Sequence, residues 1–588
     1  MKELMTGNEA IARGAYEAGA RFASAYPGTP STEILENLVM YKKDVYCEWA
    51  PNEKVALEAS IGAAIAGARS LSAMKHVGVN VAADALFTFA YTGTNGGLVL
   101  VSADDPGMHS SQNEQDNRNY ASFARVLMLE PSDSQEAKEL TKLGFELSEK
   151  FDTPVMLRVT TRICHSKSLV TFEERKEKEM VKYVKNISKY VATPSNGTIM
   201  RRNLVDRLKL MGEYSNNTQI NYAEYFNKDL GVISSGVAFQ YAKEVFGETA
   251  SYLKLGMTFP LPMEMIKEFA KNVKRIIVVE ELDPYIENQL KIAGIECVGK
   301  ELIPEYGELN PDIIRNSVLG ISNETLATDL KAVSRPPTMC AGCPHRGFFH
   351  VLSKRKNVMI SGDIGCYTLG SAPPLSAMDT CICMGASVSA GHGAAVAFKR
   401  AGEDTRVVSV IGDSTFFHSG ITGLVNVVYN KSNEVTVILD NRITGMTGHQ
   451  ENPGTGYTLM GEQAHQTDLE LLCLAIGIKK NNLYIVNPLN LKESEAALSD
   501  ALSKDEPSVI ITKWPCILKK FSEEDKRDFD LSTKKCQINQ EKCKKCKTCV
   551  KTGCPAIHSG DEIKIDEVMC TGCSVCFQVC PFEAIDKY

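Results

Sequence analysis

The sequence lacks any apolar run that approaches the roughly 18 residues of a membrane-spanning helix. It also lacks an excess of positive charge, because its 588 residues carry a formal net charge of −7. This balance argues against nucleic acid or an anionic membrane as a main partner. The N-terminus has no apolar signal-peptide core, so we expect a cytoplasmic protein. There is no low-complexity tract and no long solenoid repeat.

The alternation of strand-like and helical patterns predicts several α/β domains. At roughly 150 residues per domain, the chain has room for three to five of them. Runs such as "GGLVLVSA" and "EVTVILDN" are typical of strands in parallel sheets that helices cover. We expect α/β blocks at 1–185, 229–330 and 335–520, a polar connector at 186–228, and a cysteine-rich module at 534–588.

Cysteine is abundant, and its clustering indicates metal or redox chemistry. A reducing cytoplasm disfavours disulfides, yet the chain has 19 cysteines, eight of them between Cys543 and Cys580. The run "CTGCSVCFQVCP" has the spacing of bacterial two-cluster ferredoxins, in which the fourth Cys of each run binds the other cluster. The pattern predicts two [4Fe–4S] clusters, held by a first set, Cys543, Cys546, Cys549 and Cys580, and a second set, Cys570, Cys573, Cys576 and Cys554.

Some features of this module leave room for other interpretations. The first run has four residues rather than three between Cys549 and Cys554, and zinc also binds Cys-x2-Cys pairs. Two triple-Cys runs, each followed by Cys-Pro, favour iron–sulfur clusters over tetrahedral zinc. Cys536 has no place in either run, and we expect a packed thiol there. The lysines of "KKCKTC" either help to dock an acidic carrier or are solvated surface charge.

The segment from Val407 to Gln450 is similar to the cofactor segment of thiamine diphosphate enzymes. One expected strand ends at Gly412-Asp413 and the next at Asp440-Asn441. Mg²⁺ requires hard oxygen ligands, which the side chains of Asp413 and Asn441 and the carbonyl of Ile443 can supply. Glycines and a helix N-terminus favour the diphosphate, although Ser414 replaces the usual third-position glycine. The predicted cofactor-binding residues are Gly412, Asp413, Ser414, Asn441, Gly445 and Thr447.

Such sites also need a carboxylate from a separate domain, which bonds the aminopyrimidine ring of the cofactor. The stretch "EWAPNEKVALEASIGAA" offers Glu48, Glu53 and Glu58, each of which could equally be a solvated helix charge. Glu53 is our prediction, because it lies where a loop meets an Ala-rich helix.

Together these features resemble the thiamine diphosphate-dependent 2-oxoacid:ferredoxin oxidoreductases, over essentially the whole chain. "AYPGTPSTEI" looks like the family's Tyr-Pro-x-Thr-Pro segment, which makes Thr29 the expected substrate contact. "SADDPGMHSSQNEQDNR" and "SGDIGCYTLG" look characteristic of the indolepyruvate branch. The resemblance implies two thiamine-binding-type domains, a transketolase C-terminal-like domain, and a two-cluster ferredoxin-like α+β domain.

The resemblance also implies a third, proximal [4Fe–4S] cluster close to the thiamine. Its expected ligands are Cys340, Cys343, Cys366 and Cys516. Cys381 and Cys383 are rivals for a ligand position, although structural thiols suit them better, and His345 is more in keeping with an active-site or packed polar role. A zinc-bearing or clusterless Cys340–Cys343 pair remains open at this stage.

The implied reaction is oxidative decarboxylation of aryl 2-oxoacids to acyl-CoA and CO2, with electrons passed to ferredoxin. The implied partners are coenzyme A, ferredoxin and a smaller gamma-type (beta) subunit, in a hetero-oligomer such as α2β2. Another 2-oxoacid, such as pyruvate, a branched-chain acid or phenylglyoxylate, is an alternative substrate. A non-oxidative thiamine decarboxylase and an electron-transfer subunit are alternatives of other classes.

Overall fold

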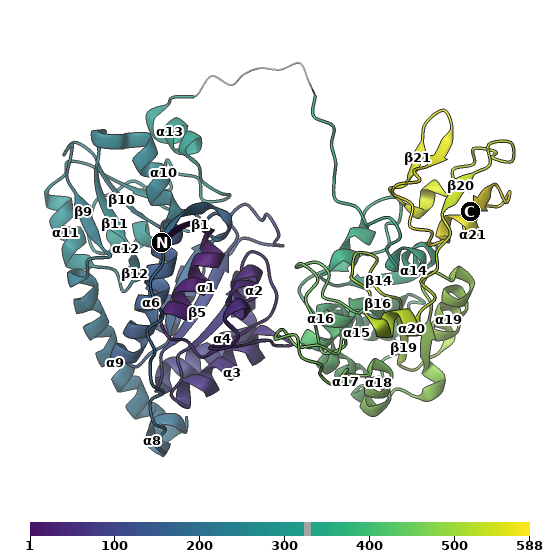
Figure 1. Ribbon diagram of the computed structural model, residues 1–588, viewed down its shortest axis with the longest axis horizontal. Helices are drawn as coiled ribbons and strands as arrows, with labels where there is room; N and C mark the ends of the chain where they lie inside the picture. The colour runs from purple at the N-terminus through teal and green to yellow at the C-terminus, as the bar shows by residue number, and fades with distance from the viewer. Residues whose placement is uncertain (323–330) are drawn as a thin grey trace. The chain divides into compact units, whose positions relative to one another are not determined.

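The computed structural model describes residues 1–322 and 331–588, which fall into two compact units, Met1–Asp329 and Leu330–Tyr588 (Figure 1). Each unit is described by itself. The predicted domain end at residue 330 lies outside the described residues. Within those residues, none of the helices has both the length and the apolarity needed to cross a membrane.

The first unit is built on a seven-stranded sheet with the order β12-β6-β7-β5-β4-β2-β3. Its strands are β2 (Phe22–Ala25), β3 (Tyr46–Trp49), β4 (Ser70–Lys75), β5 (Leu98–Asp104), β6 (Leu127–Leu129), β7 (Val155–Thr160) and β12 (Met257–Phe259). All neighbours are parallel except β12, which pairs antiparallel with β6 although it comes from a later part of the chain.

Helices cover this sheet, namely α1 (Gly7–Glu17), α2 (Thr32–Leu38), α3 (Glu53–Ile65), α4 (His76–Thr92), α5 (Arg118–Ala124), α6 (Ser134–Phe151) and α7 (Thr161–His165). The start of α3 is fixed by Asn52, whose side chain accepts a hydrogen bond from the N–H of Val55. Strand β1 (Lys2–Thr6) pairs antiparallel with β8 (Lys167–Thr171) and so joins the two ends of this block.

A smaller sheet with the order β13-β10-β11-β9 completes the first unit. It contains β9 (Tyr222–Glu224), β10 (Gly231–Ser235), β11 (Ser251–Leu255) and β13 (Ile276–Val279), with α10 (Gly236–Phe246), α11 (Met263–Lys271), α12 (Tyr285–Ile292) and α13 (Pro311–Leu319). The expected connector at 186–228 holds the short helix α8 (Ile187–Tyr190), the 24-residue helix α9 (Pro194–Asn217) and strand β9.

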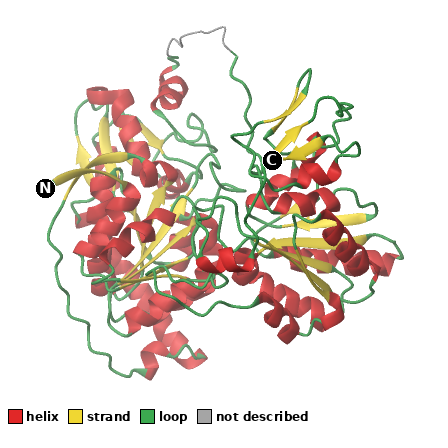
Figure 2. Ribbon diagram, turned by 45° about the vertical axis from the view of Figure 1, so that its right-hand side comes forward, coloured by secondary structure: helices red, strands yellow, loops and turns green. Residues whose placement is uncertain are grey.

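The second unit centres on a parallel six-stranded sheet with the order β15-β14-β16-β17-β19-β18. Its strands are β14 (Val358–Gly362), β15 (Thr380–Cys381), β16 (Arg406–Gly412), β17 (Val435–Asp440), β18 (Leu483–Val486) and β19 (Ser508–Lys513). Figure 2 shows helices flanking this sheet, among them α14 (His345–Leu352), α15 (Ala386–Ala401), α17 (Ile421–Tyr429), α18 (Leu469–Ile476) and α19 (Leu491–Ser503). The parallel α/β architecture predicted from the sequence is confirmed in both units.

The C-terminal module is small and rich in cysteine. It has two antiparallel pairs, β20 (Cys536–Ile538) with β23 (Ile585–Lys587) and β21 (Ile557–Ser559) with β22 (Ile563–Ile565), and one short helix, α21 (Val575–Val579). A few buried isoleucines and the cysteines themselves form its core. A core this small needs additional support to be stable alone, which metal clusters commonly supply.

Candidate functional site

The predicted magnesium and diphosphate residues meet at the carboxyl edge of the second unit's sheet. Gly412 ends β16 and is in register with Leu439 of β17, so the residues that follow the two strands lie at the same edge. The Asp413 carboxylate accepts a hydrogen bond from the Asn452 side-chain amide at 3.2 Å. The Asn441 side-chain oxygen accepts one from the Ile443 N–H, also at 3.2 Å. The oxygen atoms of Asp413 and Asn441 therefore lie at the ends of neighbouring strands, and oxygen is the ligand type that Mg²⁺ prefers.

Electrostatics at this edge also favour a cation. Burial raises the pKa of Asp413 to about 8, and repulsion by Asp440 adds to the effect. When two carboxyl groups are buried close together, ionising both has a high free-energy cost unless a positive charge lies nearby. A bound divalent cation would reverse this penalty, so the pair is suited to metal binding.

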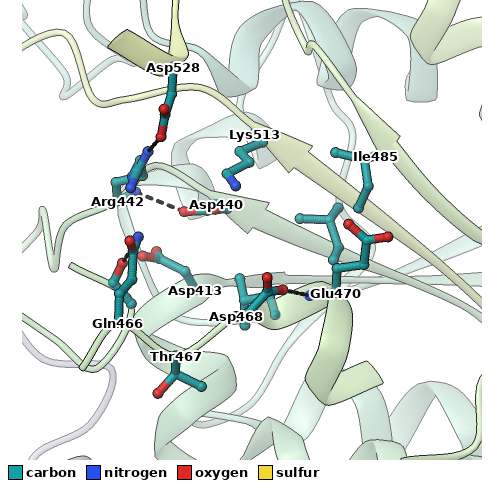
Figure 3. Close-up of a pocket in the computed structure, with 13 residues that line it drawn as sticks. Asp413, Asp440, Arg442, Gln466, Thr467, Asp468, Glu470, Ile485, Lys513 and Asp528 are labelled. Carbon is teal, nitrogen blue, oxygen red and sulfur yellow. Dashed lines mark hydrogen bonds and ion pairs between the residues drawn. The ribbon is translucent and has the colours of Figure 1, made fainter. Parts of the chain in front are cut away.

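A polar cavity opens beside Asp413 (Figure 3). Its lining carries both charge signs, with the acidic residues Asp413, Asp440, Asp468, Glu470 and Asp528 interspersed with the basic residues Arg442 and Lys513. The uncharged lining residues are Gly454, Gln466, Thr467, Leu469, Ile485 and Ile511. A lining of this kind suits a charged ligand rather than an apolar one.

The other predicted cofactor residues lie in the same loop region. Ser414 accepts a hydrogen bond from the Thr444 hydroxyl at 2.9 Å, and Thr447 donates to the Gln450 side chain at 2.5 Å. A Cβ placed on Gly445 would lie 3.8 Å from both the Asn441 amide nitrogen and the sulfur of Cys366. Gly445 therefore lies close to Cys366. We call the loop 441–447, which holds the predicted magnesium ligands Asn441 and Ile443, the metal loop.

The four predicted proximal-cluster cysteines converge on this same place. Cys340 and Cys343 form a turn before α14, with the Cys343 N–H donating to the Cys340 carbonyl at 3.1 Å. Burial, together with the neighbouring charges of Cys340 and Cys516, raises the pKa of Cys343 to about 12. Burial and the neighbouring charges of Cys516 and Cys340 likewise raise the pKa of Cys366. We call Cys340, Cys343, Cys366 and Cys516 the proximal set.

The rival cysteines have different surroundings. Burial raises the pKa of both Cys381 and Cys383, and the charge that acts on each is that of Asp363 rather than the proximal set. Within residues 1–322 and 331–588, no group of three or more His, Cys, Asp or Glu side chains is arranged to hold a metal ion. The electrostatic influence of its members on one another shows only that the cysteines of the proximal set are neighbours.

The C-terminal cysteines gather in two places. The first set, Cys543, Cys546, Cys549 and Cys580, lines a single hollow together with Ile538, Ile563 and Ile585. In the second set, the charge of Cys554 contributes to the raised pKa of Cys573. The charges of Cys573 and Cys554 contribute to the raised pKa of Cys576. The last cysteine of each run therefore lies near cysteines of the other run.

The proximal set and the second set lie next to each other. Gly342, between Cys340 and Cys343, packs so closely on Thr571 that a Cβ would collide with its hydroxyl. The buried guanidinium of Arg346 spans the same junction, donating to the Thr552 carbonyl at 3.0 Å and to the Cys340 carbonyl at 2.9 Å. This contact could not be predicted, because more than 200 residues separate its two sides along the chain.

In the first unit, the three candidate glutamates have distinct environments. Glu53 begins α3 and is 5% exposed, and a Cβ placed on Gly78 would lie 2.7 Å from its Cγ. Glu58 is an exposed partner of Lys54, and Glu48 accepts a hydrogen bond from Ser24 at 3.0 Å. Glu53 is the buried member of the three, and it packs against the first turn of α4.

The segment of Thr29 lies beside a residue that the sequence analysis missed. The Ser110 hydroxyl donates to the Thr29 carbonyl at 3.3 Å, and the Lys75 ammonium donates to the Ser110 carbonyl at 2.5 Å. Burial lowers the pKa of Lys75, while the charges of Asp105 and Glu53 raise it. Lys75 ends β4 and precedes α4, whose first turn no side chain caps. This is a favourable place for an anion.

Comparison with protein families agrees with this geometry. The model "Pyruvate flavodoxin/ferredoxin oxidoreductase, thiamine diP-bdg" matches residues 13–228, and "Thiamine pyrophosphate enzyme, C-terminal TPP binding domain" matches 363–512. "Indolepyruvate oxidoreductase domain" matches 242–303, and "4Fe-4S binding domain" matches 563–586. The chain is therefore a thiamine diphosphate-dependent 2-oxoacid:ferredoxin oxidoreductase that carries iron–sulfur chemistry.

Relatives that match nearly the full chain show which branch of this family it belongs to. The IorA subunit of indolepyruvate oxidoreductase from Archaeoglobus fulgidus is 40% identical, over 99% of this chain and 97% of its own. That of Pyrococcus horikoshii is 39% identical, over 100% of this chain and 97% of its own. A solved 2-oxoglutarate:ferredoxin oxidoreductase from Magnetococcus marinus is 18% identical, covers 54% of this chain and 65% of its own, and has a TM-score of 0.45. The chain belongs to the IorA family of indolepyruvate oxidoreductase subunits.

Proposed function

We propose that this chain is the large subunit of an enzyme that oxidatively decarboxylates aryl 2-oxoacids of the indolepyruvate type. The products are an acyl-CoA and CO2, and ferredoxin takes the electrons. The observation that carries the proposal is the adjacency of the proximal set and the metal loop, joined where the Cys516 N–H donates to the Asn441 carbonyl at 3.0 Å. A non-oxidative decarboxylase would have no use for redox-active cysteines at that position.

The residues of the second unit have the following proposed roles. Asp413, the Asn441 side chain and the Ile443 carbonyl hold Mg²⁺, while Gly412, Ser414, Gly445 and Thr447 lie along the diphosphate. Thiamine diphosphate, when bound, supplies the nucleophilic carbon and the electron sink that decarboxylation requires. The protein supplies the charge, geometry and exclusion of water around it.

In the first unit, Glu53 is proposed to bond the aminopyrimidine ring and hold a proton there. Thr29 is proposed to contact the substrate. Its neighbour Lys75 places a positive charge beside the same segment, as expected for a site that binds the carboxylate of a 2-oxoacid.

We propose three [4Fe–4S] clusters, one on the proximal set and two in the C-terminal module. The contact of Gly342 with Thr571 places the second set next to the proximal set. The first set lines its own hollow among lysines, including Lys544 and Lys547. Electrons would thus pass from the proximal set to the second set, then to the first set, where an acidic ferredoxin can dock.

The proposed assembly contains a smaller subunit, in an α2β2 arrangement, and operates in the cytoplasm.

The test of the proposed reaction is anaerobic reduction of ferredoxin or a viologen dye, with coenzyme A, across a panel of aryl, branched-chain and simple 2-oxoacids. It is run with and without the small subunit. We expect the aryl acids to give the highest kcat/KM. A preference for pyruvate or branched-chain acids would contradict the aryl assignment, and aldehyde release without dye reduction would contradict the oxidative one.

A further inference from the structure

A single buried arginine lies at the junction of the proximal set and the second set. Arg346 is in the first turn of α14 and is 1% exposed. Its guanidinium donates to the carbonyls of Met339 and Cys340, at 2.6 and 2.9 Å, and to the carbonyl of Thr552 at 3.0 Å. The cation therefore binds the backbone beside a proximal-set cysteine and the backbone just before Cys554 of the second set.

The approach to the second set is close. A Cβ placed on Gly553 would lie 3.3 Å from a terminal nitrogen of the Arg346 guanidinium. Gly553 has a φ of +69°, a conformation that favours glycine, and it directly precedes Cys554. A larger residue there would be strained and would crowd the guanidinium, so glycine lets this backbone pack against the cation.

The charge of Arg346 has no carboxylate partner among the residues that the structure describes. Its hydrogen bonds all go to main-chain carbonyls, and its buried Nε–H has no acceptor within residues 1–322 and 331–588. The buried residues Arg118 and Arg158, by contrast, each form ion pairs with two or more acidic side chains. Because a buried cation without a counter-charge has a high free-energy cost, Arg346 requires negative charge from another source.

The two neighbouring cysteine sets are suited to supply that charge. A [4Fe–4S] cluster held by four thiolates is negative overall, and net charge is one of the properties that set its potential. The guanidinium is within electrostatic range of both sets. Burial raises the pKa of Cys343 to about 12 and that of Cys573 to about 11, and the charge of Arg346 opposes both shifts. Cys343 belongs to the proximal set and Cys573 to the second set.

We propose that Arg346 is the shared counter-charge of the clusters on the proximal set and the second set, and that it raises the reduction potential of both. This inference rests on the proposed clusters. Passing one electron across the junction oxidises the proximal cluster and reduces the second-set cluster, while the guanidinium stays charged throughout. A fixed cation between them stabilises the electron on either side, so the transfer needs no proton.

The test compares Arg346→Gln with Arg346→Lys. Both keep a hydrogen-bond donor, but only lysine keeps the charge. Arg406→Gln is the matched control, because the Arg406 guanidinium also donates to two main-chain carbonyls, those of Asn433 and Lys504. Arg406 begins β16, at the end of the strand opposite to Gly412.

The measurement is a stepwise anaerobic reduction of the full-length proteins with dithionite and redox mediators. Electron paramagnetic resonance follows the clusters, and the iron content of each protein is measured. The series is repeated in a Cys366→Ala background, which removes the proposed proximal cluster and so assigns the remaining signals.

We expect Arg346→Gln to keep the wild-type content of about twelve irons per chain. At a fixed poise, two of the three clusters should become about tenfold harder to reduce, about 59 mV for each one-electron couple. The cluster on the first set should keep its wild-type potential, because the contacts of Arg346 lie at the other two sets. In the Cys366→Ala background, one of the two remaining clusters should shift. Arg346→Lys and Arg406→Gln should retain the wild-type titration.

Unchanged potentials in Arg346→Gln, or an equal shift of all three clusters, would overturn the inference. A shift of one cluster alone would tie Arg346 to one set and would overturn the shared role. Iron loss in Arg346→Gln but not in Arg346→Lys would support it, since the charge would then be needed to hold the clusters. Iron loss in both would show that the arginine only supports the fold, and about eight irons in the wild type would remove the proximal cluster and the shared role with it.

Chemical reduction needs no 2-oxoacid, so this experiment is independent of the substrate assignment. If wild-type protein reduces no dye with any 2-oxoacid while Arg346→Gln still shifts two potentials, the proposed reaction fails and the inference stands. If wild-type turnover is normal and Arg346→Gln shifts no potential, the inference alone fails.

Discussion

The backbone N–H of Cys516 donates a hydrogen bond to the carbonyl of Asn441 at 3.0 Å. One residue belongs to the proximal set and the other to the metal loop. Both follow neighbouring parallel strands, β19 and β17, whose carboxyl ends meet at one edge of the sheet. The fold therefore brings the proposed cluster ligands and the proposed metal ligands together at one edge of a single sheet.

The role of Glu53 is tested by replacing it with glutamine. Glu53→Gln should lower substrate-dependent dye reduction by about 10²- to 10⁴-fold, because an amide cannot exchange a proton as a carboxylate does. Iron content should stay at the wild-type value. Glu58→Gln is the matched control, since Glu58 is an exposed partner of Lys54 in the same helix. Near-normal turnover in Glu53→Gln would exclude the assignment.

The proximal set is tested by Cys366→Ala. Removing one thiolate ligand should release that cluster and about four irons per chain, leaving about eight in the C-terminal module. Dithionite should still reduce the module, but 2-oxoacids should not. Cys381→Ala serves as the control, because the charge acting on Cys381 is that of Asp363. Equal iron loss in both variants would indicate general damage rather than a lost ligand.

Much of the site could be predicted because its signals are local in sequence. Ligand spacing within a loop determines which cysteines can share a cluster, and the ends of β16 and β17 were evident as apolar runs followed by polar residues. The contact of Gly342 with Thr571 could not be predicted, since nothing in either segment specifies its partner. The prediction of a packed thiol at Cys536 agrees with its 1% exposure, but its neighbours could not be predicted. Its place depends on the pairing of β20 with β23.

Other features were missed although a signal was present. The connector looked polar and Asn-rich, yet α9 buries Met200, Leu204 and Met211 at helical spacing. Lys75 gave no pattern of its own, because a lone lysine after a strand is common. Its importance arises from Ser110 and Thr29, which come from separate loops of the first unit.

The raised pKa of Asp413 predicts a pH-dependent stability in metal-free protein. Burial and Asp440 raise this pKa from 3.8 to about 8, so the folded state holds a proton that the unfolded state releases. The stabilisation is present at low pH and is lost as pH rises toward about 8. Melting temperatures of metal-free Asp413→Asn should therefore fall less over this range than those of wild type. Asp404→Asn, at an exposed position, should follow the wild type, and identical slopes in all three would contradict the prediction.

The same titration links pH to cofactor binding. Mg²⁺ needs the ionised carboxylate, so binding of Mg²⁺ with thiamine diphosphate should release a proton and weaken as pH falls below about 8. Calorimetry in buffers of different ionisation enthalpy measures that proton directly. Asp413→Asn should bind the pair weakly, without this proton release. Wild-type binding with no proton release would remove Asp413 from the metal site.

Lys75 should determine substrate affinity rather than cofactor affinity. A hydrogen bond between charged groups contributes about 1.5–3 kcal/mol, so Lys75→Met should raise the KM for 2-oxoacids by about 10- to 100-fold. Lys75→Arg keeps the charge and should recover part of this loss. Lys54→Met, which removes an exposed partner of Glu58, is the control. Because an ammonium that binds the substrate carboxylate has no part in holding Mg²⁺, the affinity for thiamine diphosphate should stay unchanged. A normal KM in Lys75→Met, or a joint loss of cofactor and substrate binding, would show that Lys75 only supports the Ser110 loop.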